Sequence, residues 1–314
     1  MYMVRFAVTM NQSSGGKLPD FYVIGAQKAA TTSLYAWLSK QNKCNLPRIK
    51  ESHFFSDEQR FARGLKWYLS LFDGTSETLV RGDVDPDYLC SPGAPGRISS
   101  IHGIETPRFV VLLRNPYDRA RSHWQMAYRK SQESMEINEA ISRSFSNWPN
   151  NKPEVDYFGN GYYAVALERY IEKFGKKNIL PVPYEDLVSP GSTGKIFTEI
   201  CNFVGINEIT EAPSYTERHN IIGKPRSKLI MRLIYEKDNP LRKIVGRIIP
   251  GEELKARIAR FIVRANSSSE RETLELNHNL LPSELIESYS EMGDSLVRLW
   301  PELRASIEKW NLSG

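Results

Sequence analysis

Short, continuous apolar runs alternate with amphipathic stretches over the first two thirds of the chain. The runs FYVIG (21–25), RFVVLLR (108–114) and NILPVPYEDL (178–187) have the character of strands that are buried on both faces, as in a parallel sheet. Apolar residues at helical spacing predict helices at 31–40, 118–130, 161–174 and 192–204. This alternation predicts an α/β fold with a parallel central sheet flanked by helices.

The last third of the chain has a different pattern. Residues 209–230 are rich in proline and basic residues, which favours a loop, and 228–310 has helical spacing and predicts a helical C-terminal part. No linker interrupts the pattern, so we expect a single domain over 19–314 after a flexible lead at 1–18. We expect the basic loop and helical segment at 209–270 to lie over the cleft of that domain.

Composition narrows the class of protein. The 314 residues are 40% hydrophobic and 25% charged, which is typical of a globular protein. Cys44, Cys90 and Cys201 form no CxxC pair, so we expect ordinary thiols of a reducing compartment rather than structural zinc. The net charge of +5 suits an anionic ligand but is too small to indicate nucleic acid. We find no signal peptide and no membrane-spanning run, which favours a cytoplasmic location.

The first apolar strand leads into a loop with the layout of a phosphate-binding site. Gly25 is expected to allow a tight turn, Lys28 supplies a charge, and the hydroxyls of 31–33 open the next helix. The unpaired N–H groups and the dipole of a helix N-terminus favour an anion there. The usual nucleotide-triphosphate loop ends in Gly-Lys-Ser/Thr, whereas this lysine comes early. Alternatively, residues 31–33 only cap a helix and Lys28 is solvated.

A second stretch, VVLLRNPYDRARSHW (110–124), has polar groups at a strand end. Arg114 follows the second predicted strand, and Ser122 lies eight residues later in a predicted helix. Ligands of open α/β sheets bind at the carboxyl ends of strands, where an arginine can grip a phosphate through two hydrogen bonds. Alternatively, Arg114 pairs with a carboxylate and Ser122 has no ligand role.

Together the two stretches resemble the sulfotransferases that use 3′-phosphoadenosine 5′-phosphosulfate (PAPS) and release 3′-phosphoadenosine 5′-phosphate (PAP). The resemblance implies that the first loop holds the 5′-phosphosulfate and that Arg114 and Ser122 hold the 3′-phosphate. The donor-binding residues expected from it are Gln27, Lys28, Ala29, Ala30, Thr31, Thr32, Ser33, Arg114, Ser122, Gly223, Lys224 and Arg226.

Three further motifs resemble the heparan-sulfate branch of that family and its bacterial relatives. These are KESHFFSDEQRFARGLKWYLSLF (50–72), GDVDPDYLCSPGAPGRI (82–98) and NIIGKPRSKL (220–229). Two stretches depart from that branch. Ala30 replaces a glycine of many members. Residues 83–85 read Asp-Val-Asp where the animal glycan enzymes usually carry Glu-Lys-Thr, so Val84 replaces the lysine that approaches the acceptor in those enzymes. The second departure argues against a heparan-like polyanionic acceptor.

The resemblance also implies catalytic roles. Lys28 would stabilise the charge that develops on the bridging oxygen, and Glu51 is the usual base of this family, with His53 as its helper. Two residues apart, the last two would share one face if their segment is extended. Alternatively, His53 is only a packed residue before Phe54. Sulfuryl transfer requires no metal, and we expect none.

We therefore expect a sulfotransferase that acts on a hydroxyl, or less readily an amine, of a carbohydrate, glycolipid or small natural product. The alternatives are a P-loop-type small-molecule kinase and a non-catalytic nucleotide-binding protein. Residues 224–264 carry 12 Lys and Arg against 4 Asp and Glu, a local charge of +8. This segment either favours an anionic or membrane-interfacial acceptor or forms a solvated basic face.

Overall fold

The structure is a computed structural model. It describes residues 16–72, 79–213, 227, 230–231, 234, 258, 261–262, 265–266 and 276–313. The described residues fall into two compact units. The first unit comprises the chain up to Pro116, residues 160–213 and residues 287–313, and the second comprises 117–159 and the described part of 220–286. The residue ranges 1–15 and most of 209–270, for which we predict a flexible lead and a basic segment over the cleft, lie outside this description. The single-domain boundaries stay a prediction.

The first unit is built on a five-stranded parallel sheet with the order β2-β3-β1-β4-β5. The strands are β1 (Phe21–Gly25), β2 (Cys44–Asn45), β3 (Val80–Val84), β4 (Arg108–Leu113) and β5 (Ile179–Pro183). Phe21 of the central strand pairs with Gly82 on one side and with Arg108 on the other. The α/β class and the parallel sheet expected from the sequence are therefore confirmed.

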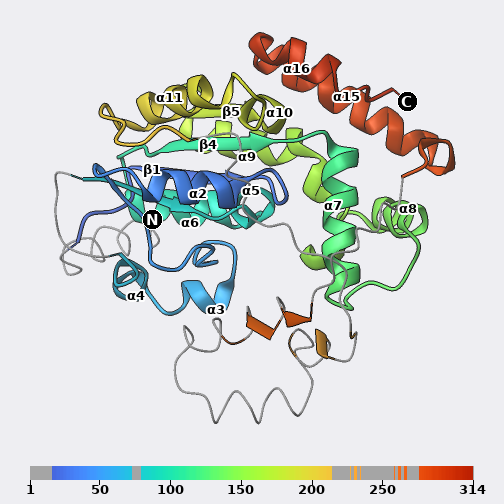
Figure 1. Ribbon diagram of the computed structural model, residues 1–314, viewed down its shortest axis with the longest axis horizontal. Coiled ribbons are helices and arrows are strands. Elements are labelled where there is room, and N and C mark those ends of the chain that lie inside the picture. Colours follow the sequence, from blue (N-terminus) through green and yellow to red (C-terminus); the bar gives the residue numbers. More distant parts are fainter. Residues whose placement is uncertain are drawn as a thin grey trace, which may run out of the picture. The chain divides into compact units, whose positions relative to one another are not determined.

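The apolar runs of the two middle strands reflect burial on both faces. Every residue of β1 is buried, as is every residue of β4 after Arg108. Helices α2 (Thr31–Ser39) and α11 (Thr193–Val204) cover one face, where Trp37 packs edge-on against Phe197 with ring centroids 6.1 Å apart (Figure 1). Helices α6 (Ala94–His102) and α9 (Tyr163–Phe174) cover the other face, where the ring centroids of Tyr170 and Phe109 lie 5.2 Å apart. Continuous apolar strands are the expected solution for such a doubly covered sheet.

The helices of the first unit are mostly short. They are α2 (Thr31–Ser39), α3 (Glu58–Phe61), α4 (Leu65–Leu69), α5 (Asp87–Cys90), α6 (Ala94–His102), α9 (Tyr163–Phe174), α10 (Tyr184–Leu187), α11 (Thr193–Val204) and α16 (Arg304–Glu308), with 3-10 turns at Gly159–Gly161, Lys176–Asn178 and Pro301–Leu303. Most of α15 (Ser283–Leu299) also belongs to it. The predicted strand at 178–187 is too long, because the chain turns into α10 after Pro183.

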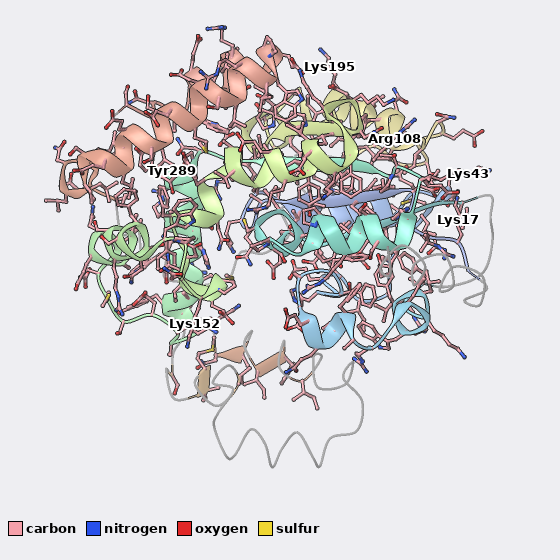
Figure 2. All side chains as sticks on the ribbon, turned by 180° about the vertical axis from the view of Figure 1, so that it is seen from behind. Lys17, Lys43, Arg108, Lys152, Lys195 and Tyr289 are labelled. Atoms are coloured by element: carbon pink, nitrogen blue, oxygen red, sulfur yellow. The ribbon has the colours of Figure 1, made fainter. Side chains whose placement is uncertain are left out.

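The two ends of the sheet differ in character. Lys17, Lys43 and Arg108 lie at the end where the strands begin (Figure 2). At the opposite, carboxyl end, neighbouring strands β3, β1 and β4 finish at Val84, Gly25 and Leu113. The loops that follow these three strands carry most of the predicted site residues, as expected for an open α/β sheet.

The second unit contains α7 (Pro116–Arg129), α8 (Ile137–Asn147) and 3-10 turns at Pro153–Val155 and His278–Leu280. Trp124 is buried, and its indole N–H donates to the carbonyl of Met135 at 3.0 Å. Arg119 is also buried and donates to the carbonyl of Tyr157. Among the described residues of both units, no helix combines the length and apolar character needed to cross a membrane.

Candidate active site

The loop between β1 and α2, residues 26–30, has an unusual backbone. Lys28 and Ala30 adopt left-handed torsions, with φ of 72° and 65°. Such torsions cost a non-glycine residue about 1–2 kcal/mol each and persist only where surrounding structure enforces them. Helix α2 then starts with no side-chain cap on its first turn and no acidic residue within it. An uncapped N-terminus without a carboxylate is suited to an anionic ligand.

Gly25 serves a different purpose from the one predicted. Its φ is not among the left-handed torsions of the chain, so the turn itself does not require glycine. A Cβ at this position would lie 2.7 Å from Cδ2 of Leu89 and 2.9 Å from Cγ1 of Val111. The glycine is needed because α5 and β4 pack directly against the end of β1.

Arg114, which follows β4, is joined to this loop. Its Nη1 donates to the carbonyl oxygen of Lys28 at 2.8 Å, and its guanidinium lies 4.5 Å above the ring of Tyr184. Its own carbonyl accepts a hydrogen bond from the hydroxyl of Tyr163. None of the described carboxylates forms an ion pair with Arg114, and its buried Nε has no partner among the described residues. The guanidinium therefore retains donor capacity and an uncompensated charge beside the loop.

The remaining predicted donor residues are less fully described. Ser122 lies half-buried on α7, in the second unit, and its pairing with Arg114 stays a prediction. Gly223, Lys224 and Arg226 lie outside the described residues.

Glu51 and His53 lie in a loop that is anchored to the end of β3. The backbone N–H of Glu51 donates to the carbonyl of Val84, and that of His53 donates to Oδ2 of Asp85 at 2.7 Å. The segment is not extended, because both residues have left-handed torsions, with φ of 62° and 53°. The two side chains therefore do not share a face through strand alternation. Their positions are set by the two backbone hydrogen bonds to Val84 and Asp85.

The imidazole of His53 is held by carboxylates. Its Nδ1 lies 3.1 Å from Oδ2 of Asp87 and 3.5 Å from Oδ2 of Asp85. Burial alone would lower the pKa of His53, but the hydrogen bond to Asp87 and the charges of Asp85, Asp87 and Glu51 together raise it to about 9. The ring is therefore an imidazolium at neutral pH. With 37% of its side chain exposed, His53 is not the packed core histidine of the alternative interpretation.

A histidine and two carboxylates are also a possible cation site, but the raised pKa of His53 favours an ion pair in which Nδ1 donates to Asp87. We therefore assign these three side chains to a hydrogen-bonded network.

Glu51 has more open surroundings than its neighbours. Its side chain is 40% exposed and pairs with the ammonium group of Lys50. An ionised carboxylate that is accessible from solvent can take a proton from an incoming hydroxyl. The structure therefore leaves Glu51 available for the role that its motif predicts.

A fourth carboxylate, that of Asp83, lies in the core next to this loop. Asp83 of β3 is fully buried and accepts hydrogen bonds from the hydroxyls of Tyr68 at 2.8 Å and Tyr88 at 3.0 Å. The ring of Tyr68 stacks on Phe54 with centroids 4.4 Å apart. Phe54, which follows His53 in the sequence, thus packs the candidate catalytic loop against the buried aromatic core.

Sequence reasoning missed Asp85 and Asp87. Asp85 follows β3 and Asp87 begins α5, both within the motif at 82–98, but the sequence showed Asp85 only as part of the departure at 83–85 and gave neither residue a role in the site. The signal was available, because a polar residue just after a buried parallel strand lies at the ligand-binding edge of the sheet.

An α/β sheet with a candidate anion-binding loop, an arginine and a carboxylate–histidine pair at adjoining strand ends fits the class of group-transfer enzymes that use a nucleotide donor. The sequence profile of the sulfotransferase domain family matches residues 18–228. The chain belongs to this family, which confirms the family expected from the motifs.

Individual relatives are distant. The chain is 28% identical over 258 residues to bifunctional heparan sulfate N-deacetylase/N-sulfotransferase 4 of Mus musculus, covering 76% of this chain and 28% of that protein. It is 26% identical over 248 residues to heparan sulfate glucosamine 3-O-sulfotransferase 3B1 of Homo sapiens, covering 76% of this chain and 58% of that protein. The chain thus spans well under two thirds of the length of these relatives.

A solved structure supports the fold. The sulfotransferase from Alicyclobacillus acidocaldarius superimposes with a TM-score of 0.56 at 24% identity, over 78% of this chain and 99% of that one.

Proposed function

We propose that this protein transfers the sulfuryl group of PAPS to a hydroxyl, or less readily an amine, of a carbohydrate, glycolipid or small natural product and releases PAP. The observation that carries the proposal is the contact between Arg114 and the carbonyl of Lys28. It joins the guanidinium of Arg114 to the backbone of the loop that carries Lys28, just before a helix N-terminus that has no side-chain cap. The family to which the chain belongs uses PAPS as its donor.

The residues present suit this donor. The first turn of α2 has no acidic residue that would repel a phosphosulfate, and the buried Nε of Arg114 is an available donor for a phosphate oxygen. Residues 27–33 would hold the 5′ end and Arg114 the 3′ end, with Ser122 and 223–226 contributing as the family resemblance implies. PAPS supplies the sulfuryl group and a phosphate leaving group, and Lys28 would neutralise charge on the bridging oxygen.

Glu51 and His53 have different roles in the proposed reaction because His53 is protonated. His53 is protonated at neutral pH, so it is a hydrogen-bond donor and cannot accept the acceptor's proton. Glu51 then takes that proton, and the nearby imidazolium helps to neutralise negative charge as the acceptor oxygen attacks. This division supports Glu51 as base and changes the proposed role of His53 from a helper of the base to a fixed cation.

The acceptor need not be a polyanion. Val84 occupies the position of the lysine that approaches the acceptor in the animal glycan enzymes, and its side chain is fully buried. A long cationic side chain is therefore missing from this strand end. The relatives named above act on heparan sulfate by their names, but we propose a less charged carbohydrate or natural product for this chain.

Two experiments test the proposal. In calorimetry we expect PAP to bind without magnesium and in preference to ATP, and with radiolabelled PAPS we expect label transfer to at least one class in a panel of glycans, glycolipids and hydroxylated natural products. Magnesium-dependent ATP binding without PAP binding would favour the kinase alternative. PAP binding without transfer to any acceptor in the panel would favour a non-catalytic binding protein.

A further inference from the structure

Asp87 contacts both the donor loop and the candidate catalytic loop. Its Oδ1 accepts a hydrogen bond from Nε2 of Gln27, and its Oδ2 lies 3.1 Å from Nδ1 of His53. These two partners are separated by 26 residues of sequence, and no other described side chain bonds to both. One carboxylate therefore links the loop that would hold the phosphosulfate to the ring beside the candidate base.

We propose that Asp87 is a positioning residue of the transfer reaction, which fixes the donor loop through Gln27 and the orientation of the His53 ring through Nδ1. This inference rests on the proposed sulfotransfer, because it assigns both partners to that reaction. Asp87 itself need not touch either substrate.

The backbone around Asp87 is fixed independently of its side chain. Asp85 is fully buried, and its Oδ1 accepts from the backbone N–H of Asp87 at 3.1 Å while its Oδ2 accepts from the backbone N–H of His53. Asp85 therefore holds the main chains of both segments. The side chain of Asp87 is therefore not needed for the backbone, and it can position the side chains of Gln27 and His53.

The ring nitrogens of His53 consequently have separate roles. Nδ1 is directed to Asp87, so Nε2 is the nitrogen left for substrate, and no described residue bonds to it. The groups that set the charge of the ring are the carboxylates of Asp85, Asp87 and Glu51, the last paired with Lys50. Of these carboxylates, Asp87 is the one that accepts the hydrogen bond from Nδ1 of His53, so neutralising Asp87 should have a direct effect on the ring.

The link to Gln27 depends on the same charge. A hydrogen bond from an amide to a carboxylate is about twice as strong as one to a neutral oxygen, so an uncharged residue at 87 would hold the donor loop less firmly. The same substitution should therefore affect donor binding and the titration of His53 together. A residue that only paired with the His53 ring would change the titration but leave donor binding unchanged.

The variant Asp87→Asn keeps the size of the side chain and one acceptor oxygen but removes the charge. We expect the NMR titration midpoint of the His53 ring to fall from about 9 by at least about one unit toward its ordinary value. We expect PAP to bind about fivefold more weakly in calorimetry, since one charge-assisted bond becomes neutral. The pH profile of kcat should then lose activity at a lower pH than in the wild type.

Two further variants complete the test. Asp294→Asn makes the same charge change at an exposed position of α15 and should leave the midpoint and PAP affinity unchanged. Asp87→Glu keeps the charge and should keep the midpoint high, and it replaces Asp87→Asn if melting curves show that the latter does not fold. A wild-type midpoint below 7, or one that does not move in a folded Asp87→Asn variant, overturns the proposal.

The titration needs no PAPS, so the two proposals can fail separately. If PAP does not bind the wild type, sulfotransfer is wrong whatever the midpoint shows. If PAP binds and label is transferred but the midpoint and PAP affinity stay the same in Asp87→Asn, only the role of Asp87 is wrong.

Discussion

Removing the hydroxyl of Tyr68 tests how the buried carboxylate of Asp83 is stabilised. That carboxylate is fully buried, and its described side-chain donors are the hydroxyls of Tyr68 and Tyr88, while its Oδ1 has no partner among the described residues. Burial raises the pKa of the Asp83 carboxyl, and the two hydroxyl bonds, the backbone N–H of Val84 and the charge of His53 oppose that shift. In Tyr68→Phe the carboxyl would lose one of its two hydroxyl donors.

The expected loss of stability depends on whether the oxygen that accepts the tyrosine hydrogen bond is charged. A hydrogen bond to a charged group contributes about 1.5–3 kcal/mol, against about 0.5–1.5 kcal/mol for one to a neutral group. Tyr35 provides the matched control, because its hydroxyl donates to the neutral carbonyl of Pro47 at 2.7 Å. We therefore expect Tyr68→Phe to lower the free energy of unfolding by about twice as much as Tyr35→Phe.

Urea unfolding at neutral pH, followed by both circular dichroism and tryptophan fluorescence, measures the two losses, and coincident transitions justify a two-state treatment. A raised folded-state pKa means that the Asp83 carboxyl destabilises the fold increasingly as pH rises from the unfolded pKa through the folded one. The loss in Tyr68→Phe should therefore shrink as pH falls through the folded-state pKa of Asp83. Equal losses for the two variants at neutral pH, or a loss in Tyr68→Phe that grows on acidification, would contradict this expectation.

Three other predictions concern the site and its support. Arg114→Ala should weaken PAP by about 2–4 kcal/mol in calorimetry but barely affect adenosine 5′-phosphosulfate, which lacks the 3′-phosphate; equal losses would contradict the assignment. Glu51→Gln should reduce kcat about 100-fold or more with PAP affinity nearly intact, and His53→Ala should reduce it less; the reverse order would exchange their roles. Burial lowers the pKa of His102 to about 4, so on acidification the unfolded state takes up the proton before the folded state does. The free energy of unfolding should therefore fall by about 3 kcal/mol between about pH 6.5 and pH 4 in the wild type, and this loss should be absent in His102→Gln.

The sequence predicted the strands whose residues are uniformly apolar. Strands β1 and β4 were predictable because burial on both faces demands such runs. Strand β3 was not, because Gly82 and Asp83 interrupt its pattern. Both residues depend on distant partners, since the ring of Phe21 occupies the space that a Cβ at Gly82 would need. Contacts between segments far apart in the sequence decide such strands, and local patterns do not contain them.

The site was predictable to a similar extent. Residues 26–33 and Arg114 could be placed because each follows an apolar run, and the structure brings them together. The network of Asp85, Asp87 and His53 could not be predicted, because it depends on left-handed torsions in the loop of Glu51 and His53. Such torsions are uncommon for residues other than glycine, and although asparagine, aspartate and histidine adopt them more often, the local sequence does not indicate them for Glu51 and His53.

The outer strands of the sheet bear on how the protein behaves in concentrated solution. At one edge, β2 has only the two residues Cys44 and Asn45, which offer little backbone for another chain to pair with. At the other edge, β5 carries Pro181 and Pro183, two residues apart, so two backbone donors are missing from the same side of the strand. Short strands and prolines at sheet edges suppress strand-to-strand aggregation. These edges should allow the described sheet to be handled at the high concentrations that the NMR titration requires without recruiting strands from neighbouring molecules.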